Sequence, residues 1–455
     1  MGAMEKQLAD FVVQLQVDQI PPSALTVIRR MVMAVIGTGF AGAAEDGVQA
    51  LRDLLTEDGG KAQASTLVFG DRLPAKAAAQ FNGTLCRALD FCDAMAPGPH
   101  IGAALFPAAL AAAELAGGCS GSEFLVALTA GAELSSRLNL TEAQYNGFDP
   151  TGIAVVFSAT AAAARILKLD AEQTVNALAL AFNRCGGSFQ SHVDGSLGVR
   201  VVQGWVAEAG VECAQMARRG ITGPQNFLTG HYGYAHLYGR DTLEPAHVVQ
   251  GLGSTWKVHN VVFKKYPSCG VTQGVTELTL ALIEERGLTA QDIRSAQVTL
   301  PPYAHRLVGH AFHIGANPRV DAQFSAAYCV ANALVCRSSK LQHFAPAQVH
   351  DPVVHDMIRN ITVVADPALD ARGHTAVDLC VRTTDGQEHR KSLDIAPGFP
   401  GAELDDAQHL ARFKDCLAYA PKPMSEPQMQ AVLRALEDLR QLSDVRELLK
   451  LLTVA

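Results

Sequence analysis

Two acids and a histidine stand close together before an apolar run, and their types suit the transfer of a proton. Asp90 and Asp93 precede a segment rich in Pro and Gly, which leads to His100 and then to a stretch made almost wholly of Ala and Leu. An imidazole titrates near neutrality, so His100 suits an acid or a base. If the apolar run is a helix, its first backbone N–H groups would attract a ligand's carboxylate beside His100. The alternative interpretation is a loop with one partly buried histidine.

Helices are expected to position these residues. Between Pro21 and Gly42, apolar residues recur at helical spacing, with prolines at the start and glycines at the end. Further helices are expected at residues 74–89, 102–116, 122–138, 155–167, 171–182 and 199–219. Each places small residues on one stripe beside larger apolar ones, which allows helices to approach closely. No strand-like alternation of useful length appears before residue 290.

Two stretches of this helical region resemble a dinucleotide-binding loop and a membrane-spanning helix. Gly37, Gly39 and Gly42 spell GxGxxG, but a dinucleotide fingerprint needs a strand before it, and the preceding segment has helical period. We interpret these glycines as the end of a helix. The run 101–118 is the most membrane-like in the chain, yet it contains Pro107 and is barely long enough to span a bilayer, so we expect a buried helix.

The pattern changes after His259. Strands are expected at residues 294–300, 361–365, 375–383 and 389–395, and helices at 270–285 and 324–335. From Asp405 the helical pattern resumes and ends in one amphipathic helix, ALEDLRQLSDVRELLKLL, which suits a core or dimer surface. The expected fold is mainly α. It has a large all-helical domain at residues 1–264, joined by C-terminal helices at 400–455, and a smaller α+β, lid-like domain at 265–399.

Length, charge and cysteines limit the function. The 455 residues suffice for two domains, and a net charge of −8 argues against nucleic-acid and anionic-membrane partners, which need a basic face. A small acidic substrate would therefore need a local cluster of cations. Ten cysteines without a CxxC pair favour a reducing cytoplasm. HxxxxHxxH at residues 305–313 lacks an acid at ligand spacing, so no metal is expected.

Several motifs, in order along the chain, resemble those of the MmgE/PrpD family. LDFCDA at residues 89–94 is similar to the family's LDFDDT, with Cys92 in place of an acid. FPAALAAAE at 106–114 is similar to PAALAAAE, KKYPSCGVTQ at 264–273 to KxYPxCxxTH, and FSAAYCVANAL at 324–334 to FS(L/I)xYxVAxAL. The family includes 2-methylcitrate dehydratase, cis-aconitate decarboxylase and iminodisuccinate epimerase.

The resemblance implies roles for four residues. His100 and Asp90 would be catalytic. Lys264, in preference to its neighbour Lys265, would anchor the substrate's carboxylate or carry a proton. Cys269 stands where family members carry histidine or cysteine, so it would be catalytic too; a small core residue is the alternative.

Further positions follow from the same resemblance. Tyr145 and Asp149 lie in YNGFDPTG, which is similar to GFHPTG, with Asp149 in place of a histidine. Arg200 follows Val199, which stands where the family carries lysine, and one residue turns a helical side chain by about 100°. Gln273 replaces another histidine. The substrate-binding residues are expected to be Tyr145, Asp149, Arg200 and Lys265.

The implied chemistry is proton removal next to a carboxylate. This step creates an enediolate-like charge, which cations or N–H donors must stabilise while a base of matched pKa stands at the carbon. The expected function is a cofactor-free lyase or isomerase for a small di- or tricarboxylate, such as a 2-methylcitrate-like hydroxy acid. An epimerase or decarboxylase is the first alternative, because Asp149, Val199 and Gln273 depart from the family pattern. A catalytically degenerate carboxylate-binding protein is the second. A homodimer is expected.

Overall fold

The chain folds into two compact units. The computed structural model describes residues 2–96 and 98–454. The first unit contains the chain up to Val261 together with the residues from Cys416 on, and the second runs from Val262 to Asp415. The second unit thus extends beyond residue 399, where the sequence analysis ended the smaller domain. Arg412 Nε donates a buried hydrogen bond of 2.6 Å to the carbonyl of Lys264, which holds the start of α19 (Asp406–Tyr419) to this unit.

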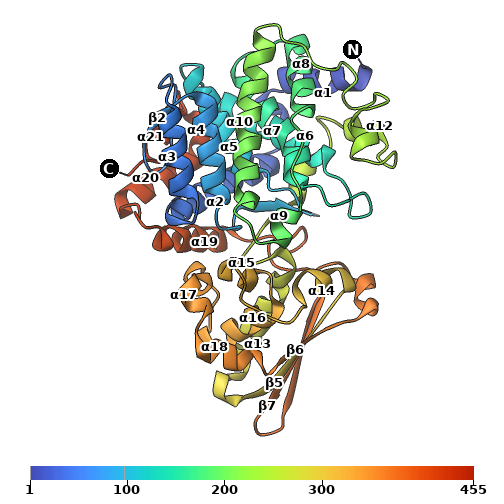
Figure 1. Cartoon of the computed structure of the whole chain (residues 1–455), viewed down its shortest axis with the longest axis vertical. Coiled ribbons are helices and arrows are strands. Elements are labelled where there is room, and N and C mark those ends of the chain that lie inside the picture. Colours follow the sequence, from blue (N-terminus) through green and yellow to red (C-terminus); the bar gives the residue numbers. More distant parts are fainter. Residues whose placement is uncertain (1, 97, 455) are drawn as a thin grey trace. The chain divides into compact units, whose positions relative to one another are not determined.

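The first unit is a helical bundle around two nearly completely buried helices, α5 (Gly102–Leu115) and α7 (Pro150–Ile166). The long helices that pack around them are α2 (Pro22–Ala41), α4 (Ala75–Arg87), α6 (Gly121–Leu138), α8 (Ala171–Phe182) and α10 (Gly198–Arg218). Figure 1 shows α4, α5, α7 and α10 side by side. The sequence prediction of a mainly helical fold is confirmed, and each helix begins and ends within a few residues of its expected bounds, apart from the earlier start of α7.

Short elements complete this unit. They are α1 (Ala3–Gln14), α3 (Val48–Asp58), α9 (Gln190–Val193), α11 (Tyr234–Leu237), α12 (Pro245–Val249), α20 (Glu426–Glu437), α21 (Arg446–Lys450), β1 (Ala64–Ser65), β2 (Arg72–Leu73) and β3 (Asp93–Met95). These strands are only two or three residues long, as the lack of alternating sequence before residue 290 predicted, and β1 pairs antiparallel with β2.

Small residues let α4 and α10 touch backbone to backbone. A Cβ on Gly83 would lie 2.8 Å from the carbonyl oxygen of Gln203, and one on Gly204 would overlap the carbonyl oxygen of Gln80. Only glycine permits this approach, so the stripe of small residues has the packing role expected of it. The close contact fixes Gln203, which reaches from α10 into the site described below.

The glycine pattern in α2 ends a helix, as predicted. Gly37 and Gly39 are buried within α2, and the helix stops at Ala41. With the turn that follows, residues Pro22–Ala44 are long and apolar enough to cross a membrane, but 67% of the most apolar window is buried inside the structure, as in the core helix of a globular protein. The membrane-like run 101–118 is also a buried helix, α5.

The second unit pairs a four-stranded sheet with helices. The strands are β5 (Ile293–Leu300), β6 (Ile361–Ala365), β7 (Val377–Thr383) and β8 (Glu388–Leu393), in the order β6-β5-β7-β8, and only β5–β6 is parallel. Its other elements are β4 (Val261–Phe263), α13 (Gln273–Arg286), α14 (Pro302–Val308), α15 (Pro318–Gln323), α16 (Ala326–Cys336), α17 (Pro346–Val349) and α18 (Pro352–Ile358), with β4 starting at the unit boundary. Alternate residues of β7 are buried against α13, which gives the sheet one covered face (Figure 1). The predicted α+β character is confirmed.

The expected single amphipathic helix at the C-terminus is wrong. α20 ends at Glu437, a turn follows, and α21 begins only at Arg446. The backbone of the turn is held by tertiary hydrogen bonds instead: Leu442 accepts from Gly121 N at 2.8 Å, and Val445 N donates to the Cys119 carbonyl at 2.9 Å. These contacts with the start of α6 compete with the helix's own hydrogen bonds and interrupt it.

Candidate active site

The segment between α4 and α5 folds back on itself around the Asp93 carboxylate. Asp93 is fully buried, and its carboxylate accepts hydrogen bonds from Ile101 N at 3.1 Å and Gly102 N at 3.0 Å. A Cβ on Gly102 would overlap Asp93 Oδ1 and lie 2.6 Å from Met31 Cγ, so the first residue of α5 must be glycine. The first N–H groups of α5 are therefore bound by the protein's own acid. The expectation that a ligand's carboxylate rests there is wrong.

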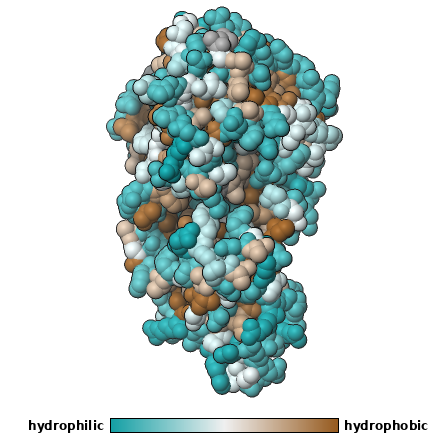
Figure 2. Space-filling model, turned by 90° about the vertical axis from the view of Figure 1, so that its right-hand side faces the viewer, coloured by the Kyte–Doolittle hydropathy of each residue, from teal (hydrophilic) through white to brown (hydrophobic). Residues whose placement is uncertain are grey.

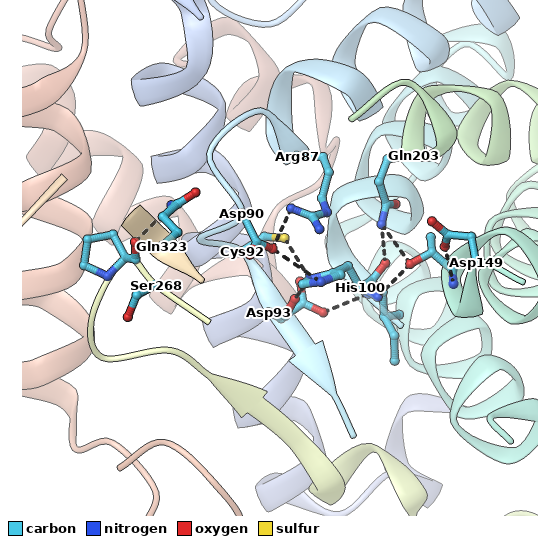
Figure 3. Close-up of polar contacts among 12 residues, drawn as sticks. Arg87, Asp90, Cys92, Asp93, His100, Asp149, Gln203, Ser268 and Gln323 are labelled. Carbon is cyan, nitrogen blue, oxygen red and sulfur yellow. Dashed lines mark hydrogen bonds and ion pairs between the residues drawn. The ribbon is translucent and has the colours of Figure 1, made fainter. Parts of the chain in front are cut away.

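His100 stands at the centre of this segment with its ring orientation fixed. Nδ1 lies 2.7 Å from the carbonyl oxygen of Asp93. A carbonyl can only accept, so Nδ1 carries the hydrogen, and in the neutral ring Nε2 has the free electron pair. Nε2 lies 3.5 Å from Asp90 Oδ1, and Cys92 Sγ lies 3.5 Å from Nδ1 (Figure 3). The ring thus presents Nε2 as its proton-accepting atom.

Two neighbouring helices hold the backbone of His100. Its N–H donates to Thr151 Oγ1 of α7 at 3.0 Å, and its carbonyl accepts from Gln203 Nε2 of α10 at 3.0 Å (Figure 3). Gln203 Nε2 also lies 3.3 Å from Thr151 Oγ1. The side chain of His100 is buried, with 8% of the residue exposed. The histidine is therefore fixed by three elements that lie far apart in the sequence.

Arg87 completes the cluster from the end of α4. Its Nη1 lies 2.6 Å from Asp90 Oδ1, and only 3% of the residue is exposed. Burial by itself lowers the pKa of the guanidinium, but the charges of Asp90, Cys92 and Asp149 outweigh this and raise the pKa above its ordinary value. Arg87 therefore remains a cation although it is buried. The sequence analysis missed it, and its position three residues before Asp90 was the available signal.

Asp149 does the work of a helix cap. Its Oδ1 accepts from Thr151 N at 2.8 Å and Gly152 N at 3.2 Å, the first turn of α7. Burial raises the pKa of its carboxyl, while these hydrogen bonds and Arg87 oppose the rise. The expectation that Asp149 binds substrate is thus replaced by a structural role beside Thr151, the residue that receives the His100 N–H.

The other two expected substrate-binding residues of the first unit have partners within it. Arg200 is buried and donates from Nη1 to the carbonyl oxygen of Asp46 at 2.7 Å. The ring of Tyr145 packs edge-on against Phe148 and Phe189, with ring centres 5.3 Å and 5.7 Å away. Arg200 thus braces the backbone before α3, and Tyr145 belongs to a surface aromatic cluster.

In the second unit, the two lysines of the KKYPSC motif differ in environment. Lys264 is buried, with 4% of the residue exposed. Lys265 is partly exposed and forms an ion pair with Glu277 at 2.7 Å, and Tyr266 donates to the same carboxylate at 2.5 Å. Lys265 is thus paired with Glu277, and its expected role as a substrate ligand stays a prediction.

The Gln273 side chain holds the turn that contains Cys269. Its Oε1 accepts from Tyr266 N at 2.8 Å, and its Nε2 donates to the Tyr266 carbonyl at 2.9 Å and the Ser268 carbonyl at 3.2 Å. Cys269 is 9% exposed, and its N–H donates to the Gln323 carbonyl at 2.9 Å. The residue that replaces the family's histidine is therefore fully used in fixing the backbone.

The structure thus brings together His100, Asp90 and, through Thr151, Asp149 in the first unit, with Arg200 and Tyr145 on other elements of it. Lys264, Lys265 and Cys269 lie on one turn of the second unit. Within residues 2–96 and 98–454, no three His, Cys, Asp or Glu side chains are grouped so as to hold a metal ion.

Comparison with known proteins agrees with this arrangement of elements and motifs. The model of the MmgE/PrpD N-terminal domain matches residues 6–245, and that of the MmgE/PrpD C-terminal domain matches residues 266–438. The chain belongs to the MmgE/PrpD family, as the sequence motifs predicted.

Its curated relatives carry one enzyme name. A cis-aconitate decarboxylase-like protein, oryM, from Aspergillus oryzae is 26% identical over 99% of this chain and 98% of its own. The cis-aconitate decarboxylases of Homo sapiens and Mus musculus are each 22% identical, over 96% and 99% of this chain and 92% and 94% of their own. The similarity thus spans both units.

Proposed function

We propose that this chain is a cofactor-free lyase or isomerase that acts next to a carboxylate of a small di- or tricarboxylic acid. Decarboxylation of a cis-aconitate-like acid is the first reaction to test, because the relatives that span the whole chain are named for it. Dehydration of a 2-methylcitrate-like hydroxy acid and epimerisation are the family alternatives. Both pass through the same carbanion-like charge next to a carboxylate.

One observation carries the proposal: His100 is held so that only Nε2 can exchange a proton. Nδ1 is bound to the Asp93 carbonyl at 2.7 Å, while Nε2 lies 3.5 Å from Asp90 Oδ1. A base fixed in one tautomer and direction needs little reorganisation when it takes a proton. We assign His100 as the acid or base, with Asp90 as its partner.

The chemistry also needs a cation for the substrate's carboxylate. Lys264 is the candidate, because it is buried and its neighbour Lys265 is paired with Glu277. In a decarboxylation, the C–C bond breaks, carbon dioxide leaves, and the electron pair that stays on carbon is quenched by a proton. His100 would first take a proton from water on Nε2 and then deliver it to that carbon, and Lys264 would bind a carboxylate that remains.

A second candidate function is a carboxylate-binding protein without turnover. Asp149 and Gln273 replace family histidines, and both are engaged in holding backbone. A side chain that holds the backbone cannot also donate a proton to a substrate. The replacement of two family histidines by such side chains therefore favours a catalytically degenerate member of the family.

One panel separates these functions. The protein is incubated in deuterium oxide with cis-aconitate, 2-methylcitrate, citrate and iminodisuccinate, and each mixture is followed by proton NMR. Loss of carbon dioxide with deuterium on carbon indicates a decarboxylase, alkene formation from a hydroxy acid a dehydratase, and exchange with inversion an epimerase. His100→Gln protein is the matched blank. A rise in melting temperature with one acid, but no reaction, would support binding only; neither reaction nor binding would refute the proposal.

A further inference from the structure

Arg87 stands out among the charged residues of the first unit because it is buried and lies next to the proposed base without touching it. It is the last residue of α4, and its Nη1 reaches Asp90 Oδ1 at 2.6 Å. The same oxygen lies 3.5 Å from His100 Nε2. One carboxylate oxygen is therefore shared between a permanent cation and a titratable ring (Figure 3).

The backbone is bent to make this sharing possible. Asp90 has a φ of +52°, a left-handed conformation that non-glycine residues adopt at a cost, although Asp adopts it more readily than most. The bend comes directly after α4 ends and turns the carboxylate back toward the helix. Strained residues of this kind persist where surrounding contacts fix them, and here the ion pair with Arg87 is such a contact.

The remaining titratable groups around the ring are otherwise engaged. The Asp93 carboxylate is bound by the first N–H groups of α5, and the Asp149 carboxylate by those of α7. Cys92, which stands where the family motif has an acid, faces Nδ1 rather than Nε2. From α10, the neutral Gln203 donates to the His100 carbonyl and to Thr151 Oγ1. Asp90 thus lies beside Nε2, and Arg87 forms an ion pair with Asp90.

We propose that Arg87 is a positioning residue, which holds the Asp90 carboxylate ionised and partly withdrawn from His100 and so keeps Nε2 ready to accept a proton. Without the guanidinium, the Asp90 carboxylate would lose the cation that lies 2.6 Å from its Oδ1 and would interact more strongly with a protonated His100 ring. The pair would then retain a proton between Oδ1 and Nε2, and less free base would be present at neutral pH. The inference deepens the proposed function, since it rests on His100 as the proton carrier.

Removing the charge of Arg87 and removing that of Asp90 should shift the pKa of His100 in opposite directions. Arg87→Met removes a positive charge near the ring, so the pKa of His100 should rise by about 1 unit. Asp90→Asn removes the negative charge and leaves Arg87 in place, so the pKa of His100 should fall by about 1 unit. Arg87→Lys keeps the charge but not the planar donor, and should shift the pKa less than Arg87→Met does. A residue that only filled space would not produce shifts of opposite sign.

The test is an NMR titration of the protein without substrate. Histidine is labelled with ¹³C, and the His100 signal is assigned by its loss in His100→Gln. Arg165→Met is the matched control, because Arg165 is also a mostly buried arginine of the first unit paired with an acid, Glu123, on other elements. It should leave the titration of His100 unchanged. If turnover is found, the limb of the kcat/KM profile that reports His100 should move upward in pH for Arg87→Met and downward for Asp90→Asn; it is the acid limb if His100 acts as a base and the alkaline limb if it acts as an acid.

Opposite shifts in the two variants, with none in the control, would support the proposal. Shifts of the same sign, or none, in folded Arg87→Met and Asp90→Asn would overturn it. If Arg87→Met does not fold, Asp90→Asn alone decides, because an unchanged or raised pKa of His100 in that variant contradicts the proposal. Failure of the substrate panel would leave this titration interpretable, so the failure of the proposed function and that of the Arg87 assignment can be told apart.

Discussion

His100 offers one ring nitrogen for chemistry, so its replacement should abolish turnover while the fold persists. We expect His100→Ala to lower kcat by about 10²-fold or more, as loss of a general acid or base does. His236→Ala is the control, because His236 is an exposed histidine of the same unit, paired with Asp241. Rates on the acid that the panel identifies, with circular dichroism to verify folding, give the measurement. An unchanged rate in folded His100→Ala would remove the assignment.

Lys264 and Lys265 are adjacent, which makes their comparison a sharp test of the carboxylate anchor. Lys264→Ala should abolish turnover, because it removes the buried cation that we propose binds the substrate's carboxylate. Lys265→Ala breaks an ion pair with Glu277 that is partly exposed to solvent, so it should have the smaller effect on kcat/KM. Steady-state kinetics of the two variants decide between them. Equal losses of kcat/KM in the two variants, or a greater loss in Lys265→Ala, would show that Lys264 is not the carboxylate anchor.

Asp149 predicts a pH dependence of stability. Burial raises the pKa of its carboxyl above the ordinary 3.8 in the folded chain, so the folded state binds the proton more tightly than the unfolded state does. Stability from this group is therefore present below pH 3.8 and is lost as the pH rises through the folded pKa. Asp149→Asn keeps the oxygen that accepts from the first N–H groups of α7 but has no titratable carboxyl. Its stability should therefore not fall as the pH rises through this range. Its melting temperature relative to the wild type should improve between about pH 4 and 7.

Asp149→Ala is the matched control for this prediction. It removes the acceptor altogether, and loss of a helix cap costs about 1 kcal/mol at every pH. An Asn variant as unstable as the Ala variant at neutral pH would show that the charge of Asp149, rather than its oxygen, supports α7.

The residues of this site differ in how far the sequence could predict them. His100 and Asp90 are close in the chain and carry recognisable chemistry, so they could be found from residue types and motif. Gln203 could not, because it reaches the His100 carbonyl from a residue 103 positions away. The first N–H groups of α5 were expected to attract a ligand's carboxylate, and the Asp93 carboxylate binds them instead. Which acid caps a helix depends on the path of a loop, and residue types do not specify that path.

At the scale of helices, the contact between α4 and α10 predicts that a glycine-to-alanine replacement destabilises the fold, although such a replacement usually stabilises a helix. Replacing an interior helix glycine by alanine ordinarily stabilises by about 1 kcal/mol. A Cβ on Gly204 would instead overlap Thr84 Oγ1 and the Gln80 carbonyl of α4. Gly204→Ala should therefore lower the free energy of unfolding by about 1–3 kcal/mol, because α4 and α10 must separate.

A glycine on the same helix provides the comparison. A Cβ on Gly198 would lie 3.0 Å and 3.2 Å from the hydroxyl oxygens of Ser191 and Ser196, which can move aside, and 3.6 Å from Ser191 Cβ, an ordinary contact. Gly198→Ala should be nearly neutral. Denaturant melts of both variants provide the free energies, and equal stability of the two would mean that the two helices do not depend on this close approach.

Periodicity predicted most helices and strands because their hydrogen bonds are local. α5 and α10 begin and end within one or two residues of the expected bounds. The C-terminal segment shows where this logic stops. Its spacing is helical throughout, yet Gly121 N and the Cys119 carbonyl bind its backbone at Leu442 and Val445. A pattern of side chains does not report that a distant backbone competes for the same hydrogen bonds.

At the scale of the whole molecule, the net charge bears on substrate binding, and the exposed apolar side chains bear on association. The net charge of −8 repels small acids from a distance, so a substrate anion must be attracted by buried cations such as Lys264. The face in Figure 2 shows brown apolar residues among a teal hydrophilic majority. Composition predicted the acidic surface directly. It could not predict where exposed apolar side chains gather, because that depends on which helix faces remain uncovered.

The expected homodimer would form where exposed apolar side chains can be buried. Of the large ones among the described residues, seven belong to the first unit, including Val193 at 70% and Trp205 at 51% exposure, and two to the second. Burying such area gains about 25 cal/mol per Å². We therefore expect light scattering to give about twice the 48.2 kDa of one chain, through association of first units. A mass of one chain at every concentration measured would contradict the dimer. Dissociation to that mass only on dilution would support the dimer and give its dissociation constant.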